Sequence, residues 1–206
     1  MIAVIDYGMG NLRSVSKAIE YVGGDVVVTD NPLKIKDAKG IVLPGVGAFK
    51  DAVKNLRDRG LWETIIEEAE KGKPFLGICL GLHLLFEVGY EFGKTEGLGI
   101  IKGEVVRFEL SREYKIPHMG WNRIKIQKES EFLKGVRDGE FFYFVHSYYV
   151  KPKEKEVALT LTDYGIDFVS AIEKENIIAT QFHPEKSQKA GLKLLKNFVE
   201  MVEKGV

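Results

Sequence analysis

The only cysteine of the 206-residue chain, Cys79, lies in the stretch KPFLGICLG, with Gly77 and Gly81 two residues away on either side. The stretch is typical of a buried strand that turns sharply into a helix, where α/β hydrolases carry their nucleophile. Glycines on both sides leave room for the strained backbone of such a turn, and the helix N-terminus would favour a thiolate. The sequence therefore predicts a cysteine nucleophile, although a lone cysteine is more often a small buried hydrophobic residue.

His183 and Glu185, in the stretch NIIATQFHPEKS, are the best candidates for the acid–base partner of Cys79. A strand leads up to His183, so its imidazole is expected at the carboxyl end of a strand, on the same edge of the sheet as the cysteine. Pro184 keeps His183 extended, and Glu185 then lies where it can accept from the imidazole and fix its tautomer. A His-x-Glu pair alone is common on solvated strand ends. Together with Cys79 it indicates a nucleophile, a base and an orienting carboxylate.

Short β-rich runs alternate with amphipathic helices in the first half of the chain, which predicts βαβ units and a parallel sheet. Asn11 is a good N-cap for the first helix, and Gly23 and Gly24 end it. The expected strands are residues 2–6, 25–30, 40–45 and 74–78, and the expected helices are residues 11–22, 48–59, 61–71 and 80–88. Sites in such sheets lie beyond the carboxyl ends of the strands, where Cys79 is expected.

The second half of the chain consists mostly of short strands joined by turns, followed by a final helix over residues 187–203. The expected strands are residues 103–109, 122–127, 141–150, 157–162, 167–173 and 176–182. The sequence thus predicts an α/β fold with a mostly parallel central sheet flanked by helices and additional antiparallel strands in the second half. Because no linker or repeat interrupts the pattern, residues 1–206 are expected to form a single domain.

The charges of the chain balance, because Lys+Arg and Asp+Glu number 30 each. A net charge of zero argues against a surface for nucleic acid or anionic lipid. No apolar stretch approaches the roughly 20 residues of a membrane span, and the N-terminus lacks a basic leader. A single cysteine cannot form an internal disulfide, which suits a reducing compartment. We therefore expect a soluble, cytoplasmic protein.

Two glycine-rich segments resemble nucleotide-binding loops only superficially. The segment LPGVG, residues 43–47, lacks the Gly-Lys-Ser/Thr ending of a P-loop, and Arg13 occupies the third glycine position after DYGMG. The histidines are widely separated in sequence and Cys79 is committed to the elbow, so no metal site is expected. The sequence predicts neither a metal nor another cofactor.

The stretch GICLG, followed far downstream by QFHPEKS, resembles the class I (triad-type) glutamine amidotransferases, whose elbow cysteine works with a histidine and a glutamate in H-P-E. The resemblance extends over essentially the whole chain and implies a flavodoxin-like fold. Further pieces are similar to one branch of the family, the glutaminase subunits of imidazole glycerol phosphate synthase. These pieces are DYGMGN, LPGVGAF, PHMGWN, YFVHSYY, TDYG and HPEKS.

The resemblance implies a role for each candidate catalytic residue. Cys79 would attack the side-chain amide of L-glutamine, His183 would protonate the departing ammonia, and Glu185 would orient His183. Water would then hydrolyse the γ-glutamyl thioester to glutamate. An amide nitrogen is a poor leaving group until it is protonated, so a positioned imidazole suits this chemistry.

The negative charge that develops on the attacked carbonyl oxygen needs donors nearby. The backbone N–H of Leu80, directly after the nucleophile, is well placed to be one. The resemblance assigns the second donor to the backbone around Gly45, Val46 and Gly47. The alternative for this loop is a flexible turn between a strand and a helix.

Three further residues are candidates for binding the substrate. The resemblance implies that Ser147 and Tyr148, in YFVHSYY, help to hold glutamine, although alternation in a half-buried strand would also explain this pattern. His83 occupies a position where the family usually has a glutamine that contacts the substrate. Its imidazole can also donate to a carboxylate or carbonyl; otherwise His83 is a helix-face residue with no role.

The amidotransferase domain uses the whole chain, so a second chain would have to consume the ammonia. The resemblance implies a heterodimer with a (β/α)8-barrel cyclase that makes imidazole glycerol phosphate and a purine-pathway ribotide in histidine biosynthesis. It also places the segment PHMGWN, expected to be a turn that carries Trp121, on the docking face. Because free glutaminase activity would waste glutamine, the isolated chain is expected to be nearly inactive, with its LPGVG loop misaligned until partner and acceptor bind.

Three other functions are compatible with parts of the pattern. One is an amidotransferase subunit for anthranilate, aminodeoxychorismate or pyridoxal phosphate synthesis, against which PHMGWN and YFVHSYY argue. Another is a cysteine hydrolase or redox sensor that works without a partner. The last is a non-catalytic flavodoxin-like binding module in which Cys79 is merely buried.

Overall fold

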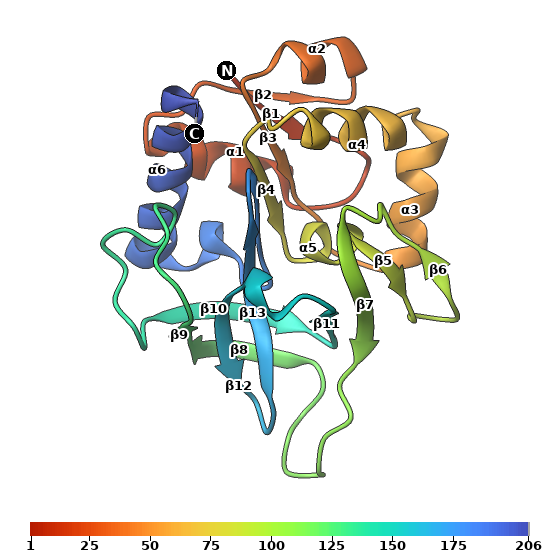
Figure 1. Ribbon diagram of the computed structural model, residues 1–206, viewed down its shortest axis with the longest axis vertical. Helices are drawn as coiled ribbons and strands as arrows, with labels where there is room; N and C mark the ends of the chain where they lie inside the picture. The colour runs from red at the N-terminus through yellow and green to blue at the C-terminus, as the bar shows by residue number, and fades with distance from the viewer. Residues whose placement is uncertain (206) are drawn as a thin grey trace.

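The computed structural model describes residues 1–205 as an α/β fold built on one large mixed sheet (Figure 1). Its first elements are β1 (Ile2–Ile5), α1 (Leu12–Tyr21), β2 (Val26–Thr29), α2 (Pro32–Asp37), β3 (Gly40–Leu43), α3 (Phe49–Asp58), α4 (Trp62–Glu70), β4 (Phe75–Ile78), α5 (Leu80–Leu84) and β5 (Phe86–Gly89). The remaining strands and the last helix are β6 (Thr95–Glu96), β7 (Ile101–Arg107), β8 (His118–Arg123), β9 (Lys125–Ile126), β10 (Phe141–His146), β11 (Tyr148–Pro152), β12 (Ala158–Asp163), β13 (Asp167–Lys174), β14 (Ile177–Thr180) and α6 (Gln188–Lys204).

The strands β2, β1, β3, β4 and β14 are parallel and lie side by side in that order. Because side chains alternate between the two faces of a sheet, these strands are apolar on both. One face packs against α1 and α6, and the other packs against α3 and α4 (Figure 1). Cys79 directly follows β4, and β14 pairs with β4 up to Thr180 opposite Ile78, three residues before His183. Parallel pairing therefore brings the two candidate catalytic segments to one edge.

The helix ends in the first half follow the chemistry of their capping residues. The Asn11 side chain accepts from the backbone N–H of Ser14 at 3.2 Å, as expected for an N-cap. Helix α2 was not predicted, although Asn31 accepts from the N–H of Leu33 at 2.9 Å and Pro32 occupies its first turn. Asparagine followed by proline is a helix-start signal, so α2 was detectable from the sequence.

The predicted helix over residues 80–88 is wrong in its second half. Helix α5 ends at Leu84, and the chain continues as strand β5, which pairs in parallel with β7. The stretch from Leu80 to Phe86 is buried throughout, so its apolar residues show no periodicity that separates a helix from a strand. Pairing with the distant β7 decides the conformation.

The antiparallel strands of the second half extend the sheet, with β13, β11 and β7 following β14 and with β12 pairing with β13. Two predictions here are wrong. The segment PHMGWN is not a turn, because β8 spans most of it and pairs with β10, and only β9 covers the end of the strand expected at residues 122–127. The strand expected at residues 141–150 is interrupted at Ser147, because β10 and β11 belong to different sheets.

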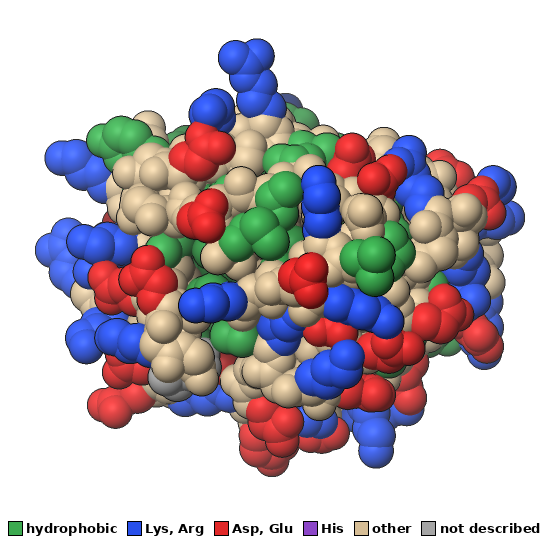
Figure 2. Space-filling model, turned by 90° about the horizontal axis from the view of Figure 1, so that it is seen from above, with side chains coloured by type: hydrophobic (Ala, Val, Ile, Leu, Met, Phe, Trp, Pro, Cys, Tyr) green, Lys and Arg blue, Asp and Glu red, His purple; other side chains and the backbone are tan. Residues whose placement is uncertain are grey.

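Charged side chains of both signs are interspersed over the surface shown in Figure 2, in keeping with the balanced composition. Within residues 1–205, none of the helices is both long and apolar enough to cross a membrane. In the same part of the chain, the His, Cys, Asp and Glu side chains form no group of three or more that could hold a metal ion.

Candidate active site

Cys79 forms the sharp turn between β4 and α5, with backbone angles of φ 54° and ψ −108°. This positive φ is unfavourable for a residue with a side chain and marks a strained site. The flanking glycines are required by close packing: a Cβ on Gly81 would lie 1.9 Å from the carbonyl oxygen of Leu43, and one on Gly77 would lie 3.0 Å from the Cβ of Ala179. The predicted elbow is therefore present, and its neighbours have no room for side chains.

His183 and Glu185 form a buried hydrogen-bonded pair next to the elbow. Nδ1 of His183 lies 2.8 Å from Oε1 of Glu185, and both side chains are only 2% exposed. His183 is extended, as predicted from Pro184, and its backbone N–H donates to the carbonyl of Tyr143 at 3.0 Å. Among the described residues, neither Nε2 of His183 nor Oε2 of Glu185 has a hydrogen-bond partner. The pair is thus fixed at one end and has free polar atoms at the other.

The protonation of His183 is set by its neighbours. Burial by itself lowers the pKa of His183, but attraction to Cys79 and the hydrogen bond to Glu185 outweigh it and raise the pKa to about 10. An imidazole with this pKa is protonated at neutral pH. A protonated His183 beside a sulfur stabilises a thiolate and holds a proton ready for a leaving group.

A cleft of about 510 Å³ opens over Cys79. It is lined by Val46, Gly47, Ala48, Cys79, Leu80, His83, Glu91, Val145, His146, Ser147 and Tyr148. Of the predicted site residues, this lining includes Cys79 and Leu80, Val46 and Gly47 of the glycine-rich loop, and all three substrate-binding candidates. Gly45, His183 and Glu185 are not part of it.

The glycine-rich loop presents a carbonyl to the elbow instead of a donor. The N–H of Leu80, a predicted oxyanion donor, donates to the carbonyl of Gly45 at 3.2 Å. The Tyr7 hydroxyl donates to the carbonyl of Pro44 at 2.7 Å and leaves no space for a Cβ on Gly45. Burial raises the pKa of Tyr7 far above its usual value, so this hydroxyl keeps its proton. In this conformation the backbone N–H of Leu80 is hydrogen-bonded to the loop itself.

His83 is not a solvated helix-face residue. It is 6% exposed, lines the cleft, and its Nε2 lies 2.7 Å from Oε1 of Gln181. Burial lowers the pKa of His83 to about 4, so the imidazole is neutral. Its ring therefore contacts another protein side chain as well as facing the cleft.

Sequence reasoning missed two polar residues at the site. Glu91 lines the cleft, and its carboxylate accepts from the N–H of Phe49 at 2.9 Å. Gln181 is fully buried, and its amide nitrogen lies 3.7 Å from the sulfur of Cys79. Glu91 lies in a polar loop without a motif, whereas Gln181 stands two residues before His183, where a search for polar neighbours of the candidate base would have found it.

Together, the strained cysteine at the end of a parallel strand and the buried His–Glu pair define an α/β protein with a sharp cysteine-bearing turn between a strand and a helix. The family model described as "Glutamine amidotransferase class-I" matches residues 3–202, and the chain belongs to this family. The family resemblance in the sequence is therefore confirmed.

Among the members of this family, relatives with high sequence identity along the whole chain share one name. The protein "Imidazole glycerol phosphate synthase subunit HisH" of Aquifex aeolicus is 60% identical over 202 residues, which cover 98% of this chain and 97% of that protein. The protein of the same name from Caldanaerobacter subterraneus subsp. tengcongensis is 55% identical over 203 residues, covering 98% of this chain and 99% of that protein.

Solved structures confirm the fold class at low sequence identity. A crystal structure of a glutamine amidotransferase superposes with a TM-score of 0.77 at 18% identity, covering 98% of this chain and 100% of that chain. The glutaminase domain of Trypanosoma brucei CTPS with bound acivicin gives a TM-score of 0.70 at 18% identity, covering 98% and 93% of the two chains.

Proposed function

We propose that this chain is the glutaminase subunit of imidazole glycerol phosphate synthase and that it hydrolyses L-glutamine through Cys79. The observation that carries the proposal is the buried His183–Glu185 pair beside the strained Cys79. Relatives that are 55% and 60% identical along nearly their whole length bear the name of this subunit, which supports the choice of synthase.

The first chemical step is the attack of the Cys79 thiolate on the side-chain carbonyl carbon of glutamine. A carbon–sulfur bond forms, and the carbonyl π electrons move onto the oxygen. Protonated His183 then gives its Nε2 proton to the amide nitrogen, the carbon–nitrogen bond breaks, and ammonia leaves. The buried Nε2 has no other hydrogen-bond partner among the described residues, which keeps its proton available.

The second step releases glutamate. Water attacks the γ-glutamyl thioester while neutral His183 takes up its proton, the carbon–sulfur bond breaks, and the thiolate and imidazolium are restored. Glu185 accepts a hydrogen bond from the Nδ1–H of His183 throughout and stabilises the charged imidazole, as the orienting carboxylate of a triad does.

Ser147, Tyr148 and Glu91 line the cleft and are the groups that we assign to the rest of the substrate. A carboxylate at Glu91 suits the α-ammonium group of glutamine by charge, and polar groups at Ser147 and Tyr148 suit its α-carboxylate. His83 contributes to the wall of the same cleft.

The backbone N–H of Leu80 is hydrogen-bonded to the carbonyl of Gly45, which supports the expectation that the isolated chain is nearly inactive. One missing oxyanion donor typically lowers kcat by about 10²–10³-fold. We infer that binding of the partner and its acceptor turns the loop. The carbonyl of Gly45 would then point away from the elbow, and a backbone N–H of residues 45–47 would take its place as an oxyanion donor. Gly47, at φ 104°, allows such a turn at low steric cost.

The partner that fits this function is a (β/α)8-barrel cyclase that takes up the ammonia and makes imidazole glycerol phosphate and a purine-pathway ribotide. Strand β8 supports a docking face, because Met119 is 62% exposed and Trp121 is 45% exposed. Met119 and Trp121 stand two residues apart on β8 and so share one face, and adjoining exposed apolar side chains mark interaction surfaces. The heterodimer would work in the cytoplasm and need no cofactor in this subunit.

The test is glutamine hydrolysis by the purified chain alone, with the barrel cyclase, and with the cyclase plus its ribotide substrate. We expect slow hydrolysis alone, a rise of at least about 10²-fold in the full complex, and background rates for Cys79→Ala. Full turnover by the chain alone would contradict the inference that this loop conformation is inactive. Activation only by a synthase for another product would assign the chain to that synthase instead.

A further inference from the structure

The side-chain amide of Gln181 lies between His83 and the sulfur of Cys79. Its Oε1 accepts from His83 Nε2 at 2.7 Å, and its Nε2 donates to the Cys79 sulfur at 3.7 Å. Gln181 is fully buried and its backbone N–H donates to the carbonyl of Ser170 at 2.8 Å, so the residue is held at both ends. Neither Gln181 nor His83 is a member of the Cys–His–Glu set, although Gln181 contacts its sulfur.

His83 determines which end of this amide faces the sulfur. A neutral imidazole that carries its proton on Nε2 donates to the amide oxygen, and the NH₂ group must then point toward Cys79. The low pKa of His83, about 4, keeps the ring neutral over the physiological range. The opposite amide orientation would bring an oxygen against the sulfur, which would repel a thiolate.

The other groups around the sulfur do not replace this donor. The Cys79 thiol donates to the carbonyl of Val145 at 3.9 Å, an interaction that only the neutral thiol can make. The hydroxyl of Tyr7 is committed to the carbonyl of Pro44. His183 is the cationic neighbour, and Gln181 supplies a neutral N–H from the same polypeptide segment.

We propose that Gln181 and His83 are positioning residues: His83 orients the Gln181 amide so that its N–H donates to the Cys79 thiolate and stabilises it. This role in glutamine hydrolysis rests on the proposed function. The interaction itself involves only side chains of this chain, so it is tested separately from glutamine hydrolysis.

The test is the rate at which iodoacetamide alkylates the full-length chain, measured from pH 5 to pH 10. Losing a hydrogen bond to a charged group should move the midpoint of this profile upward by about one pH unit in Gln181→Met, so the rate well below both midpoints falls about tenfold. His83→Phe removes the orienting N–H and should shift the midpoint in the same direction by roughly half as much. His83→Gln keeps a donor and should restore the wild-type profile.

Thr162→Val is the matched control, because it removes a buried hydroxyl that has no hydrogen-bond partner among the described residues. It should leave the alkylation profile unchanged. At pH values above all midpoints the rates of the variants should converge, since only the thiolate fraction differs. Rates lowered equally at every pH would mean that access to the sulfur had changed, and would overturn the proposal.

Unchanged midpoints in folded Gln181→Met and His83→Phe would also overturn it. Folding is checked by thermal unfolding. If Gln181→Met does not fold, the comparison of His83→Phe with His83→Gln decides alone. The alkylation assay uses neither glutamine nor a partner, so its failure leaves the glutaminase proposal standing. Conversely, a chain that cannot hydrolyse glutamine would still give the alkylation result.

Discussion

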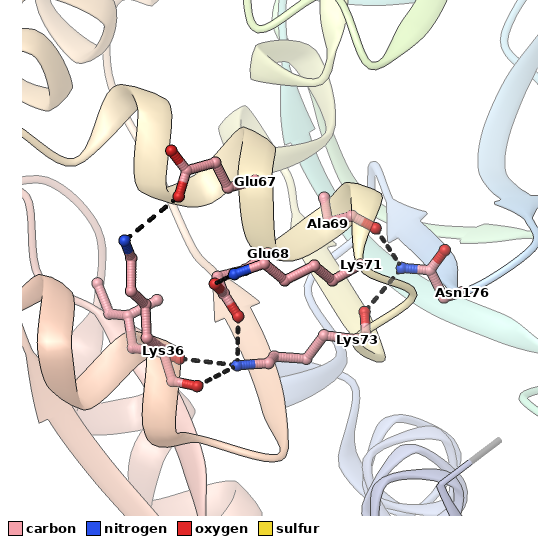
Figure 3. Close-up of polar contacts among 8 residues, drawn as sticks. Lys36, Glu67, Glu68, Ala69, Lys71, Lys73 and Asn176 are labelled. Atoms are coloured by element: carbon pink, nitrogen blue, oxygen red, sulfur yellow. Dashed lines mark hydrogen bonds and ion pairs between the residues drawn. The ribbon is translucent and has the colours of Figure 1, made fainter.

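Strand β4 has a buried polar cluster at each of its ends, and the two clusters differ in how completely their polar atoms are paired. At the amino end, Glu68 is 2% exposed and accepts from Lys71 at 2.6 Å and from Lys73 at 2.7 Å (Figure 3). Lys73 also donates to the carbonyls of Ile35 and Lys36, at 3.0 and 2.8 Å. The cluster joins α2, α4 and the start of β4.

The amino-end cluster is extended by Asn176, whose amide donates to the carbonyls of Ala69 and Lys73 just before β14 (Figure 3). Both carboxylate oxygens of Glu68 and the ammonium group of Lys73 have partners. A buried charge is tolerated when it is paired in this way. The arrangement fixes the segments that lead into the two central strands.

The carboxyl-end cluster, formed by Cys79, His183 and Glu185, is incomplete by the same criterion. Two of its buried polar atoms have no partner among the described residues, and its cysteine has a strained backbone. Unpaired buried atoms and backbone strain both reduce stability, and their combination in one cluster is typical of functional sites. The two clusters therefore differ in the completeness of their hydrogen bonding: the amino-end cluster is fully paired, whereas the cluster that we propose to be catalytic is not.

The largest expected effect is at the carboxyl end. Glu185→Gln should lower kcat of the complex by about 10³–10⁴-fold, because the amide cannot stabilise the imidazolium and permits the wrong tautomer. Steady-state glutaminase kinetics measure this, and His183→Asn provides the comparison. A loss of less than tenfold would show that the carboxylate is not needed to orient His183.

The pH dependence of the same variant sharpens this prediction. The pKa of His183 is raised to about 10, so the proton donor is present below that pH and is lost as pH rises through it. Removing the Glu185 carboxylate takes away one cause of the raised pKa. The alkaline limb of the rate profile should therefore move to lower pH in Glu185→Gln, and an unmoved limb would contradict the assigned cause.

At the amino end, the expected effect is on stability alone. Glu68→Gln should reduce the free energy of unfolding by about 2 kcal/mol, because two lysines lose their counter-charge while the amide oxygen still accepts a hydrogen bond. Urea unfolding measures the change, and kcat of the complex should stay within twofold of wild type. A large loss of activity without a loss of stability would show that the amino-end cluster also acts in catalysis, and would contradict the proposed difference between the two clusters.

Acidic pH should remove the difference in stability between wild type and Glu68→Gln. Burial alone would raise the pKa of Glu68, but the hydrogen bonds from Lys71 and Lys73 outweigh it and hold the pKa below its ordinary value of 4.5. A lowered folded-state pKa contributes stability that is present above the unfolded-state pKa and is lost as pH falls through the folded one. Urea unfolding of wild type and Glu68→Gln should differ by a constant amount from pH 8 to about pH 5 and converge below it.

The smallest effect is expected at the rim of the amino-end cluster. Lys36 and Glu67 form an ion pair with Nζ and Oε2 3.3 Å apart, and their side chains are 42% and 52% exposed (Figure 3). Exposed pairs contribute at most about 1 kcal/mol, so Lys36→Gln should change the free energy of unfolding by less than about 0.5 kcal/mol. A change as large as that of Glu68→Gln would show that burial is not what makes the cluster stabilising.

The sequence predicted those parts of the site that depend on local patterns. The elbow follows from glycines two residues on either side of Cys79, and the extended His183 follows from Pro184. The alternation of strands and helices gave the parallel sheet, and hence the common edge on which both lie. These features need only neighbouring residues and general rules of chain geometry.

The features that the sequence could not predict depend on contacts between distant segments. The position of Gln181 two residues before His183 marks it as a neighbour of the candidate base, but its contact with Cys79 spans 102 positions in the chain and depends on packing. The sequence pattern over residues 86–88 favours a helix, but pairing with the distant β7 makes this segment strand β5. The engaged Leu80 donor likewise depends on which way the Gly45 carbonyl turns. Long-range packing, rather than propensity, fixes all three.

Cys79 is the residue that we propose to attack glutamine. A diazo-ketone analogue of glutamine, added to the complex with the cyclase, tests this proposal by mass spectrometry of the intact chain and its peptides. We expect one adduct, on Cys79, that forms more slowly when glutamine competes. No adduct, or an adduct on another residue that glutamine does not prevent, would contradict it.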